Sequence, residues 1–383
     1  MSLPTSTPET RIDFLYLSEE DMVAAGVTDV AACVDAMEET FALLHAGDYR
    51  MGGPNANSHG VALSFPDESA FPMPANTPDR RFMAMPAYLG GAFGTTGVKW
   101  YGSNPENRTR GLPRSILMFM LNSTETGQPL ALMSANLLSA YRTGAVPGLG
   151  ARFLARPDAR TVGIVGPGVM ARTSLAAFVA ECPKVDTVKI KGRGRASMES
   201  FAAWVAEDLP QVTTVVEVDS IEEAVRESDI VTFCTSNVRG DPARYPTVVR
   251  DWVKPGAFLS MPGVCNIDAG MQRPEVRKVV DNAKMYQAWA DDVGYPVHRK
   301  VTLLGSKFMD MIHDGLMAPA DLIDLGAVVA SAAVGRRDDD EIVILSVGGM
   351  PVEDVAWGTT VYRHALERGI GTSLPLWEGP ALV

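Results

Sequence analysis

The sequence predicts an α/β protein in which a doubly wound parallel sheet is joined to a second, α+β domain with a mostly antiparallel sheet. Three observations lead to this fold class. From residue 161 onward, strand-like and helix-like segments alternate, which is typical of a doubly wound sheet. Before residue 135, strand-like runs follow one another with turns between them, as in an antiparallel sheet. A glycine-rich turn separates the first strand of the alternating part from a helix-like segment.

Residues 1–135 are expected to form the α+β domain. Strand-like runs occur at 14–17, 61–65, 82–89, 97–101, 115–122 and 129–133. Ser18 and Asp21 have the spacing of a capping box, which predicts a helix start directly after the first strand. Helical spacing at 30–45 stops at Gly47, and glycine commonly ends helices. Small and apolar residues at 134–154 predict one or two helices that lead into the next domain.

Residues 136–349 are expected to form the dinucleotide-binding domain of the Rossmann type. Strands are predicted at 161–165, 187–191, 213–217, 230–234, 257–261, 278–280 and 342–346. Helices are predicted at 170–180, 197–207, 220–227, 271–277 and 318–334. An amphipathic helix at 352–368 ends at Gly369, and residues 350–383 are expected to return to the first domain.

The most informative segment is the turn Gly166-Pro167-Gly168-Val169-Met170-Ala171. It has the GxGxxA spacing of a dinucleotide fingerprint in the strand–turn–helix context that such a site needs. Gly166 permits the tight turn, Gly168 lets the backbone approach a pyrophosphate, and Ala171 lets the helix pack closely on the strand. The N–H groups at the helix start then face the phosphates. A plain structural turn is the alternative interpretation.

The end of the second strand indicates which nucleotide is preferred. An NAD-selective site usually ends this strand with Asp or Glu, but Lys191 and Gly192 stand there. Arg193, Arg195 and the Ser197 hydroxyl follow, and they would attract a 2′-phosphate. The segment therefore favours NADP(H) over NAD(H), with an exposed basic turn as the alternative.

Composition excludes several classes of function. The 383 residues carry a net charge of −12, which argues against nucleic acid and anionic membranes as partners. The four cysteines lack CxxC spacing, and no His or carboxylate cluster has metal-ligand spacing, so we expect no metal site. The N-terminus lacks the features of a secretory signal and no apolar run approaches a membrane span, so a cytoplasmic protein is expected.

An ordered series of motifs resembles the ornithine cyclodeaminase/mu-crystallin family. The matching segments are Met85-Pro86-Ala87-Tyr88-Leu89, Gly97-Val98-Lys99-Trp100, Asn104-Pro105-Glu106-Asn107, Gly111-Leu112-Pro113-Arg114-Ser115, Thr126-Gly127-Gln128-Pro129-Leu130, Arg142-Thr143-Gly144-Ala145, the turn at 166–171, Ser346-Val347-Gly348 and Val352-Glu353-Asp354-Val355. The resemblance implies a two-domain homodimer that joins through residues 1–135 and binds NAD(H) or NADP(H). It further implies an amino acid, keto acid or imine substrate in that domain.

The resemblance also assigns roles to single residues. Lys99 matches a lysine of the family's substrate pocket, and Arg142 matches the arginine that binds the substrate carboxylate. The cofactor would be bound by Thr143, Gly166, Gly168, Val169, Met170, Ala171, Thr235, Ser236 and Val347. The chemistry fits, since a carboxylate suits the planar guanidinium and an imine or carbonyl that accepts hydride needs a proton donor or cation.

Two departures from the family pattern point to an altered substrate. Cys265, or Val264 if the alignment slips by one, stands where cyclodeaminases have an aspartate, and Asp268 is the reserve acid/base candidate. The early Met–Pro–x–Arg pattern reads Met51-Gly52-Gly53-Pro54-Asn55, without its arginine. Arg114 either binds a second carboxylate or forms an ordinary ion pair. His59 either faces the active site or belongs only to its loop.

Three hypotheses about function follow. The first is an NADP(H)-preferring oxidoreductase that acts on the C–N bond of an amino acid, an imine or an opine-type substrate. The second is an ornithine- or lysine-type cyclodeaminase that recycles bound NAD(H). The third is a non-catalytic, mu-crystallin-like protein that binds NADP(H).

Overall fold

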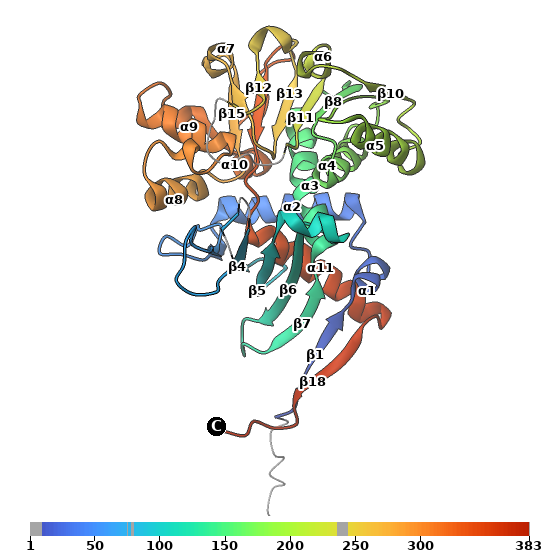
Figure 1. Ribbon diagram of the computed structural model, residues 1–383, viewed down its shortest axis with the longest axis vertical. Helices are drawn as coiled ribbons and strands as arrows, with labels where there is room; N and C mark the ends of the chain where they lie inside the picture. Colours follow the sequence, from blue (N-terminus) through green and yellow to red (C-terminus); the bar gives the residue numbers. More distant parts are fainter. Residues whose placement is uncertain (1–9, 75, 78–79, 236–243, 383) are drawn as a thin grey trace, which may run out of the picture.

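Two sheets stack end to end in the computed structural model, which describes residues 10–74, 76–77, 80–235 and 244–382. Helix α2 (Val30–Ala46) crosses between them (Figure 1). The expected fold class is confirmed, since one eight-stranded sheet is parallel and the other mostly antiparallel. A small third sheet pairs β12 (Thr247–Val248) with β14 (Asn266–Ile267). No helix in the described ranges has both the length and the apolarity needed to cross a membrane.

The parallel sheet has the strand order β10-β9-β8-β11-β13-β17-β15-β16. The chain starts in the middle at β8 (Thr161–Val165), builds outward to one side and then returns to β11 (Ile230–Phe233) on the other side. Ligands of such sheets bind where the direction reverses, beyond the carboxyl ends of the strands. The remaining strands are β9 (Thr187–Lys191), β10 (Thr214–Glu217), β13 (Phe258–Met261), β15 (Arg277–Val280), β16 (Leu322–Asp324) and β17 (Val343–Ser346).

The second sheet has the order β18-β1-β7-β6-β5-β4-β2, with β3 paired to β4. Its neighbours are antiparallel except for β1 and β7. The strands are β1 (Ile12–Leu17), β2 (Tyr49–Met51), β3 (Val61–Leu63), β4 (Arg81–Leu89), β5 (Thr95–Ser103), β6 (Ser115–Ser123), β7 (Pro129–Ser134) and β18 (Thr372–Trp377). The chain ends therefore meet in one pair of strands, because β18 lies beside β1 (Figure 1).

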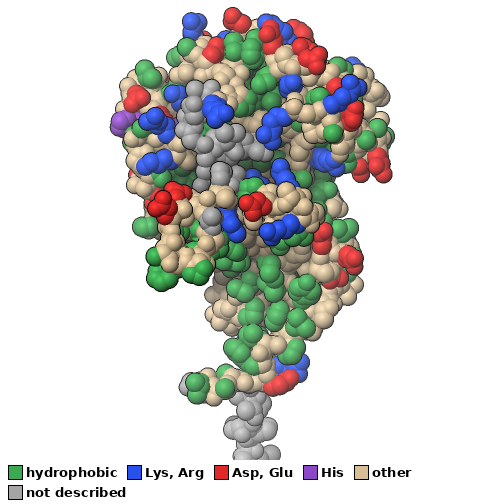
Figure 2. Space-filling view, in the orientation of Figure 1, with side chains coloured by type: hydrophobic (Ala, Val, Ile, Leu, Met, Phe, Trp, Pro, Cys, Tyr) green, Lys and Arg blue, Asp and Glu red, His purple; other side chains and the backbone are tan. Residues whose placement is uncertain are grey.

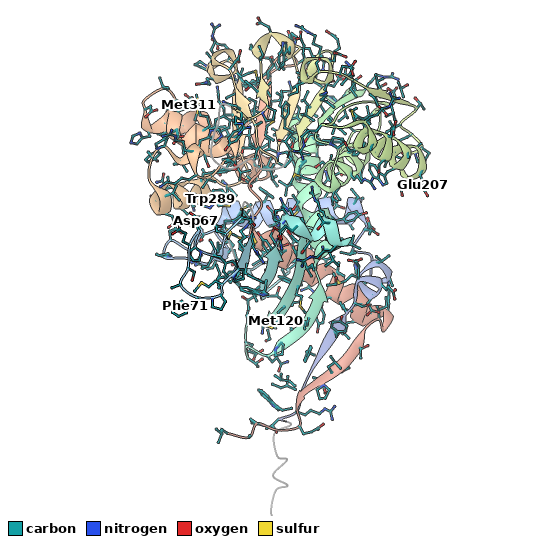
Figure 3. All side chains as sticks on the ribbon, in the orientation of Figure 1. Asp67, Phe71, Met120, Glu207, Trp289 and Met311 are labelled. Atoms are coloured by element: carbon teal, nitrogen blue, oxygen red, sulfur yellow. The ribbon has the colours of Figure 1, made fainter. Side chains whose placement is uncertain are left out.

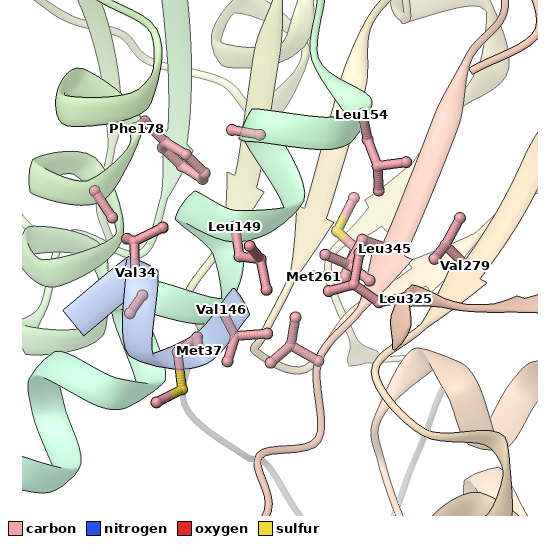
Figure 4. Close-up of a cluster of buried hydrophobic side chains, with 14 of the residues drawn as sticks. Val34, Met37, Val146, Leu149, Leu154, Phe178, Met261, Val279, Leu325 and Leu345 are labelled. Carbon is pink, nitrogen blue, oxygen red and sulfur yellow. The ribbon is translucent and has the colours of Figure 1, made fainter. Parts of the chain in front are cut away.

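Three long helices connect the sheets: α2, α3 (Asn136–Leu154) and α11 (Pro351–Arg368). α11 packs on β4, β5 and β6. The division of the chain into domains at 135 and 349 stays a prediction. Apolar side chains of α2, α3 and the parallel sheet form one buried cluster, which includes Met37, Val146, Leu149 and Leu345 (Figure 4).

Glycines on α3 bring it unusually close to α4 (Val169–Glu181), the helix after the fingerprint turn. A Cβ atom added to Gly144 would lie 2.4 Å from the backbone carbon of Thr173, and one on Gly148 would lie 2.5 Å from the Cβ atom of Ala177. Only glycine permits this approach, so the spacing of Gly144 and Gly148 fixes α3 against the helix that begins at the fingerprint.

The helices predicted at 271–277 and 318–334 are wrong. The first is shortened to α7 (Ala269–Gln272), because Pro274 disfavours helical backbone at the preceding residue. In the second region, β16 extends the parallel sheet beside β15, and the helical structure is divided into a 3-10 turn (Pro319–Asp321) and α10 (Leu325–Val329). The other helices are α1 (Glu19–Ala24), α5 (Arg195–Asp208), α6 (Ile221–Val225) and two that sequence analysis missed, α8 (Ala283–Val293) and α9 (Leu304–His313).

Candidate functional site

The fingerprint turn has the geometry of a diphosphate cradle. Gly166 has a φ of +91°, and a Cβ atom there would lie 2.9 Å from the carbonyl oxygen of Cys234. Gly168 is the N-cap of α4, and among the described residues no heavy atom lies within 4 Å of the place where its Cβ would be. In the same part of the chain, no side chain caps the first turn of α4. The N–H groups of this turn are therefore available to an anion.

The end of β9 lies beside this turn. A Cβ atom on Gly192 would lie 3.2 Å from the Pro167 ring and 2.9 Å from the Ser197 hydroxyl. Arg195 pairs with Glu199 at 2.8 Å, and the Ser197 hydroxyl donates to the Gly194 carbonyl at 2.7 Å. The exposed Arg193 guanidinium makes no hydrogen bond or ion pair within the described ranges. Arg193 is thus an exposed cation in the turn that follows β9.

Several other predicted cofactor residues lie at the carboxyl ends of the parallel strands. The Thr235 hydroxyl donates to the Val264 carbonyl, and Gly263 donates its N–H to Phe233 at 2.7 Å. Val347 is buried and donates its N–H to Met261 at 3.2 Å. Ser236 lies outside the described residues. These contacts join the ends of β11, β13 and β17, the edge at which such sheets bind nucleotides.

Lys99 and Arg142, the two predicted substrate residues, are held together by a carboxylate. The Lys99 ammonium lies 2.7 Å from Oδ2 of Asp354, and Arg142 Nε lies 3.0 Å from Oδ1 of the same residue. Arg142 Nη1 also lies 2.7 Å from Oε2 of Glu353. The Ser139 hydroxyl accepts from Lys99 at 3.2 Å and from Arg142 at 3.5 Å. We call Lys99, Ser139, Arg142, Glu353 and Asp354 the charged cluster.

The local sequence explains why these elements bring the residues of the charged cluster together. Ser139 and Arg142 are three residues apart on α3 and share one helix face. Glu353 and Asp354 occupy the first turn of α11, where the helix dipole favours negative charge. Residues 347–350 join the carboxyl end of β17 directly to α11. The cluster therefore adjoins the edge of the sheet that carries the fingerprint turn.

Burial shapes the charges of the cluster. Burial, followed by the nearby Arg142, lowers the pKa of Lys99 to about 8 against the opposing effect of Asp354. Burial also raises the pKa of Glu353 to about 7, although Arg142 acts in the other direction. Burial alone would lower the pKa of Arg142, but Asp354 and Glu353 raise it above its usual value. Arg142 is thus a permanent cation, whereas Lys99 can exchange a proton near neutral pH.

Asp281, directly after β15, supports the loop that leads into α11. Its Oδ2 atom accepts hydrogen bonds from the N–H groups of Gly348 at 2.6 Å and Gly349 at 3.0 Å. Gly349 has a φ of +75°, and a Cβ atom there would lie 2.7 Å from Nη1 of Arg142. Glycine at this position therefore gives the guanidinium the space it occupies.

His59 lies where the two sheets meet. Its ring lies 5.3 Å from that of Trp289 on α8, which Figure 3 labels between the two sheets. Trp289 in turn contacts Tyr286. Burial and then the charges of Lys99 and Arg142 lower the pKa of His59 to about 3, so its imidazole is neutral. The loop thus brings His59 near the charged cluster, which supports the first of the two interpretations of this residue.

The remaining predicted residues are more distant or engaged elsewhere. Asp268 is the N-cap of α7, where its carboxylate accepts from the Met271 N–H at 2.9 Å. Figure 1 shows α7 at the far end of the parallel sheet from α11, so the geometry does not join Asp268 to the charged cluster. Cys265 is fully buried, and burial raises the pKa of its thiol to about 12. The Thr143 hydroxyl donates to the Ser139 carbonyl at 2.6 Å.

Arg114 directly precedes β6, whose Ser115 pairs with Ser103 at the end of β5. The contacts of α11 run along β5 from Lys99 to Thr95, since Asp354 bonds the first and Thr359 the second. The strand ends at Ser103 and Ser115 therefore lie beyond the start of α11. Arg114 is placed five residues along the sheet from the level of Lys99, roughly 16 Å at 3.3 Å per residue.

Sequence analysis missed Glu353, Asp354, Ser139 and Asp281 as functional residues. Two adjacent acids inside an otherwise apolar helix start were a possible signal, because unpaired buried carboxylates are rare. Within the described part of the chain, no group of three or more His, Cys, Asp or Glu residues could hold a metal ion.

Comparisons with known proteins identify the family of this chain and its similar folds. A model of the ornithine cyclodeaminase/mu-crystallin family matches residues 26–369. The N-((2S)-2-amino-2-carboxyethyl)-L-glutamate dehydrogenase of Staphylococcus aureus is 26% identical over 366 residues, which cover 95% of this chain and 99% of that protein. The alanine dehydrogenase of Archaeoglobus fulgidus is 29% identical over 296 residues, 77% of this chain and 84% of that protein. A solved archaeal alanine dehydrogenase dimer with bound NAD has a TM-score of 0.75 at 26% identity, covering 96% of this chain and all of that one.

Proposed function

The chain belongs to the ornithine cyclodeaminase/mu-crystallin family, and we propose that it is an NAD(P)(H)-dependent oxidoreductase that acts on the C–N bond of an amino acid or its imine. Both relatives named above are amino acid dehydrogenases by name, and the solved neighbour binds NAD. The oxidoreductase proposal is therefore favoured over the cyclodeaminase and the non-catalytic binding protein.

One observation carries the proposal: the arginine of the charged cluster lies two residues before the glycine that fixes α3 against α4. Because Gly144 contacts Thr173 in the second turn of α4, Arg142 is held in a defined position relative to the fingerprint turn. The arginine proposed to bind the substrate carboxylate and the turn proposed to bind the diphosphate thus belong to one closely packed helix pair, α3 and α4. Such preorganisation is what hydride transfer between two bound molecules requires.

The residues fit a reduction of an imine or its reverse. The bound nicotinamide would supply or accept the hydride. Arg142 would bind the substrate carboxylate with N–H groups that Glu353 and Asp354 leave unused. Lys99, with a pKa of about 8, would donate a proton to the developing amine nitrogen and recover it from solvent. In the oxidative direction, neutral Lys99 would accept that proton.

We further propose that NADP(H) is preferred over NAD(H). No carboxylate occupies the end of β9, and Arg193 extends from the adjacent turn without a partner in the described ranges. A 2′-phosphate there would gain charge-assisted hydrogen bonds. Arg195 would contribute only by giving up its pairing with Glu199.

A homodimer is proposed on the basis of an exposed apolar sheet face. Trp100, Ile116, Met118 and Met120 of β5 and β6 are each between 37% and 51% exposed. Figure 2 shows hydrophobic side chains gathered over these strands, and Met120 is labelled there in Figure 3. Contiguous apolar patches of this kind usually mark interfaces.

All four cysteines are free, which fits the reducing, cytoplasmic compartment expected from the sequence.

A substrate screen tests the proposed function. NADPH and NADH consumption would be followed with 2-keto acids, each supplied with ammonia or with an amino acid as the amine. We expect turnover that requires both the keto acid and the amine, with the amine-linked product detected by mass spectrometry. A requirement for two carboxylates would implicate Arg114. Tight cofactor binding without turnover on the whole panel would contradict the proposal.

A further inference from the structure

Glu353 is the one carboxylate of the charged cluster with an unused oxygen. Its side chain is fully buried, and Oε2 accepts from Arg142 at 2.7 Å. Among the described residues, Oε1 of Glu353 has no hydrogen-bond partner. Both oxygens of Asp354, by contrast, bond to a cation. A buried, ionised carboxylate with an unpartnered oxygen is costly, so the site supports a charge on Asp354 better than on Glu353.

The count of buried charges strengthens this distinction. Lys99, Arg142, Glu353, Asp354 and Asp281 are all at most 5% exposed. Fully ionised, these two cations and three anions carry a formal charge of −1. The arrival of a substrate carboxylate would add a second uncompensated negative charge among buried residues. Taking up a proton is far less costly than burying that charge.

We infer that Glu353 is a proton-linked positioning residue: it takes up a proton from solvent when the substrate carboxylate binds at Arg142, and releases it when the carboxylate leaves. Throughout, Oε2 remains an acceptor for Nη1 and holds the guanidinium in place. The proton joins Oε1, the oxygen without a partner, and no bond to the substrate is made or broken. This inference rests on the proposed function, because it assumes that Arg142 binds a carboxylate.

Few other groups near Glu353 can take up this proton. Burial and then Asp281 raise the pKa of Tyr286, and burial and then Glu353 raise that of Cys33, so both side chains stay neutral. Burial, followed by Lys99 and Arg142, keeps His59 neutral too. Lys99 has a pKa of about 8 and Asp281 of about 6. Asp281 already accepts three backbone N–H groups, which stabilise its charged form.

The first test is an infrared pH titration of the intact protein with NADP+ bound and no substrate. We expect a protonated carboxylic acid band that titrates at about pH 7 in the wild type, above the band of Asp281 at about pH 6, and that is missing in Glu353→Gln. Gln keeps an oxygen for Arg142 and cannot titrate. Glu378→Gln, which changes an exposed carboxylate paired with Arg11, is the matched control and should keep the band. A band that Glu353→Gln retains, or that only Asp281→Asn removes, overturns the inference.

The second test is calorimetric titration of pyruvate into the same complex, in two buffers that differ in ionisation enthalpy, at about pH 8. We expect the wild type to take up close to one proton per pyruvate and Glu353→Gln to take up at least half a proton less. Equal uptake by both proteins overturns the inference. If pyruvate does not bind, proton uptake cannot be coupled to carboxylate binding, and this result also counts against the inference. The infrared band does not depend on the substrate, so failure of the proposed function alone leaves that band intact.

Discussion

Oδ2 of Asp354 lies 2.7 Å from the ammonium of Lys99, across a buried contact between the first turn of α11 and the middle of β5. The two residues are 255 positions apart in the chain. Their contact, together with the bond from Oδ1 to Arg142, makes one aspartate the link between both predicted substrate residues.

Asp354→Asn should lower both activity and stability. The change removes the negative charge that favours protonated Lys99, so the pKa of Lys99 falls below about 8. The limb on which the rate of reduction declines with rising pH should therefore move to lower pH. Breaking a buried ion pair on one side typically costs about 3–5 kcal/mol. Asp13→Asn, which changes an exposed pair with Arg11, should alter neither property. If the pH dependence of the reduction rate in Asp354→Asn equals that of the wild type, Lys99 is not the proton donor.

Gly144→Ala should lower the thermal stability of the protein, whereas Gly168→Ala should weaken its binding of NADPH. A Cβ on Gly144 would lie 2.4 Å from Thr173, so alanine there should cost about 1–3 kcal/mol and lower Tm. Gly168 has open space in the described structure, so alanine there should leave the Tm of the nucleotide-free protein nearly unchanged. It should instead weaken NADPH binding, because the methyl group would meet the diphosphate. Thermal unfolding with and without NADPH measures both. Unchanged NADPH affinity in Gly168→Ala would contradict the placement of the diphosphate.

Arg193→Ala should weaken NADPH much more than NADH. A charge-assisted hydrogen bond is worth about 1.5–3 kcal/mol, so the Kd for NADPH should rise about 10- to 100-fold. Titration of both nucleotides into wild type and variant gives the ratio, and Arg195→Ala should have the smaller effect because Arg195 is already paired. Equal losses for the two nucleotides would refute the proposed preference.

Trp100→Glu combined with Met118→Glu should convert a dimer to monomers. The two residues pair across β5 and β6 on the exposed face, and charges there would be buried unpaired in an interface. Light scattering after size-exclusion chromatography gives the mass. Val216→Glu, at another exposed apolar position on β10, is the control and should stay dimeric. A double variant with the mass of the wild type would show that this face is not the interface.

Glu353→Gln should gain stability relative to the wild type as the pH rises. The folded-state pKa of Glu353 is raised from 4.5 to about 7, so the folded protein binds the proton more tightly than the unfolded chain. Its contribution to stability is therefore complete below about pH 4.5 and is lost as the pH rises to about 7. The full difference is on the order of 3 kcal/mol. Chemical unfolding of both proteins across this range measures it, and a constant difference between them would show that Glu353 does not titrate there.

Much of the fold could be predicted because its signals are local. The capping box at Ser18 and Asp21, the left-handed Gly47 that ends α2, and the strand at 161–165 all match the structure. The errors arose where tertiary contacts decide the secondary structure of a segment. β16 is a strand because β15 offers it a free edge, and nothing in residues 322–324 alone shows that partner.

Some residues of the candidate site could likewise be predicted from local sequence, and others could not. Lys99 and Arg142 could be named from short motifs, and the structure joins them through one carboxylate. Asp354 could not be identified as that link, because its partners lie 255 and 212 residues away in the chain. Asp268 was proposed from nearness in sequence to the missing family aspartate, but the chain turns at Asp268 to start α7 and carries it away from the cluster. Whether it has any role in proton transfer stays a prediction.

The most direct test of the central claim is a crystal structure of the protein with NADP(H) and the keto acid found in the substrate screen. We predict the diphosphate on the N–H groups at the start of α4, and the substrate carboxylate on Arg142. The substrate carbon should lie about 3–3.5 Å from the reactive nicotinamide carbon, with Lys99 on the substrate nitrogen or oxygen. A nucleotide bound away from Gly168, or a substrate that contacts neither Lys99 nor Arg142, would contradict the account.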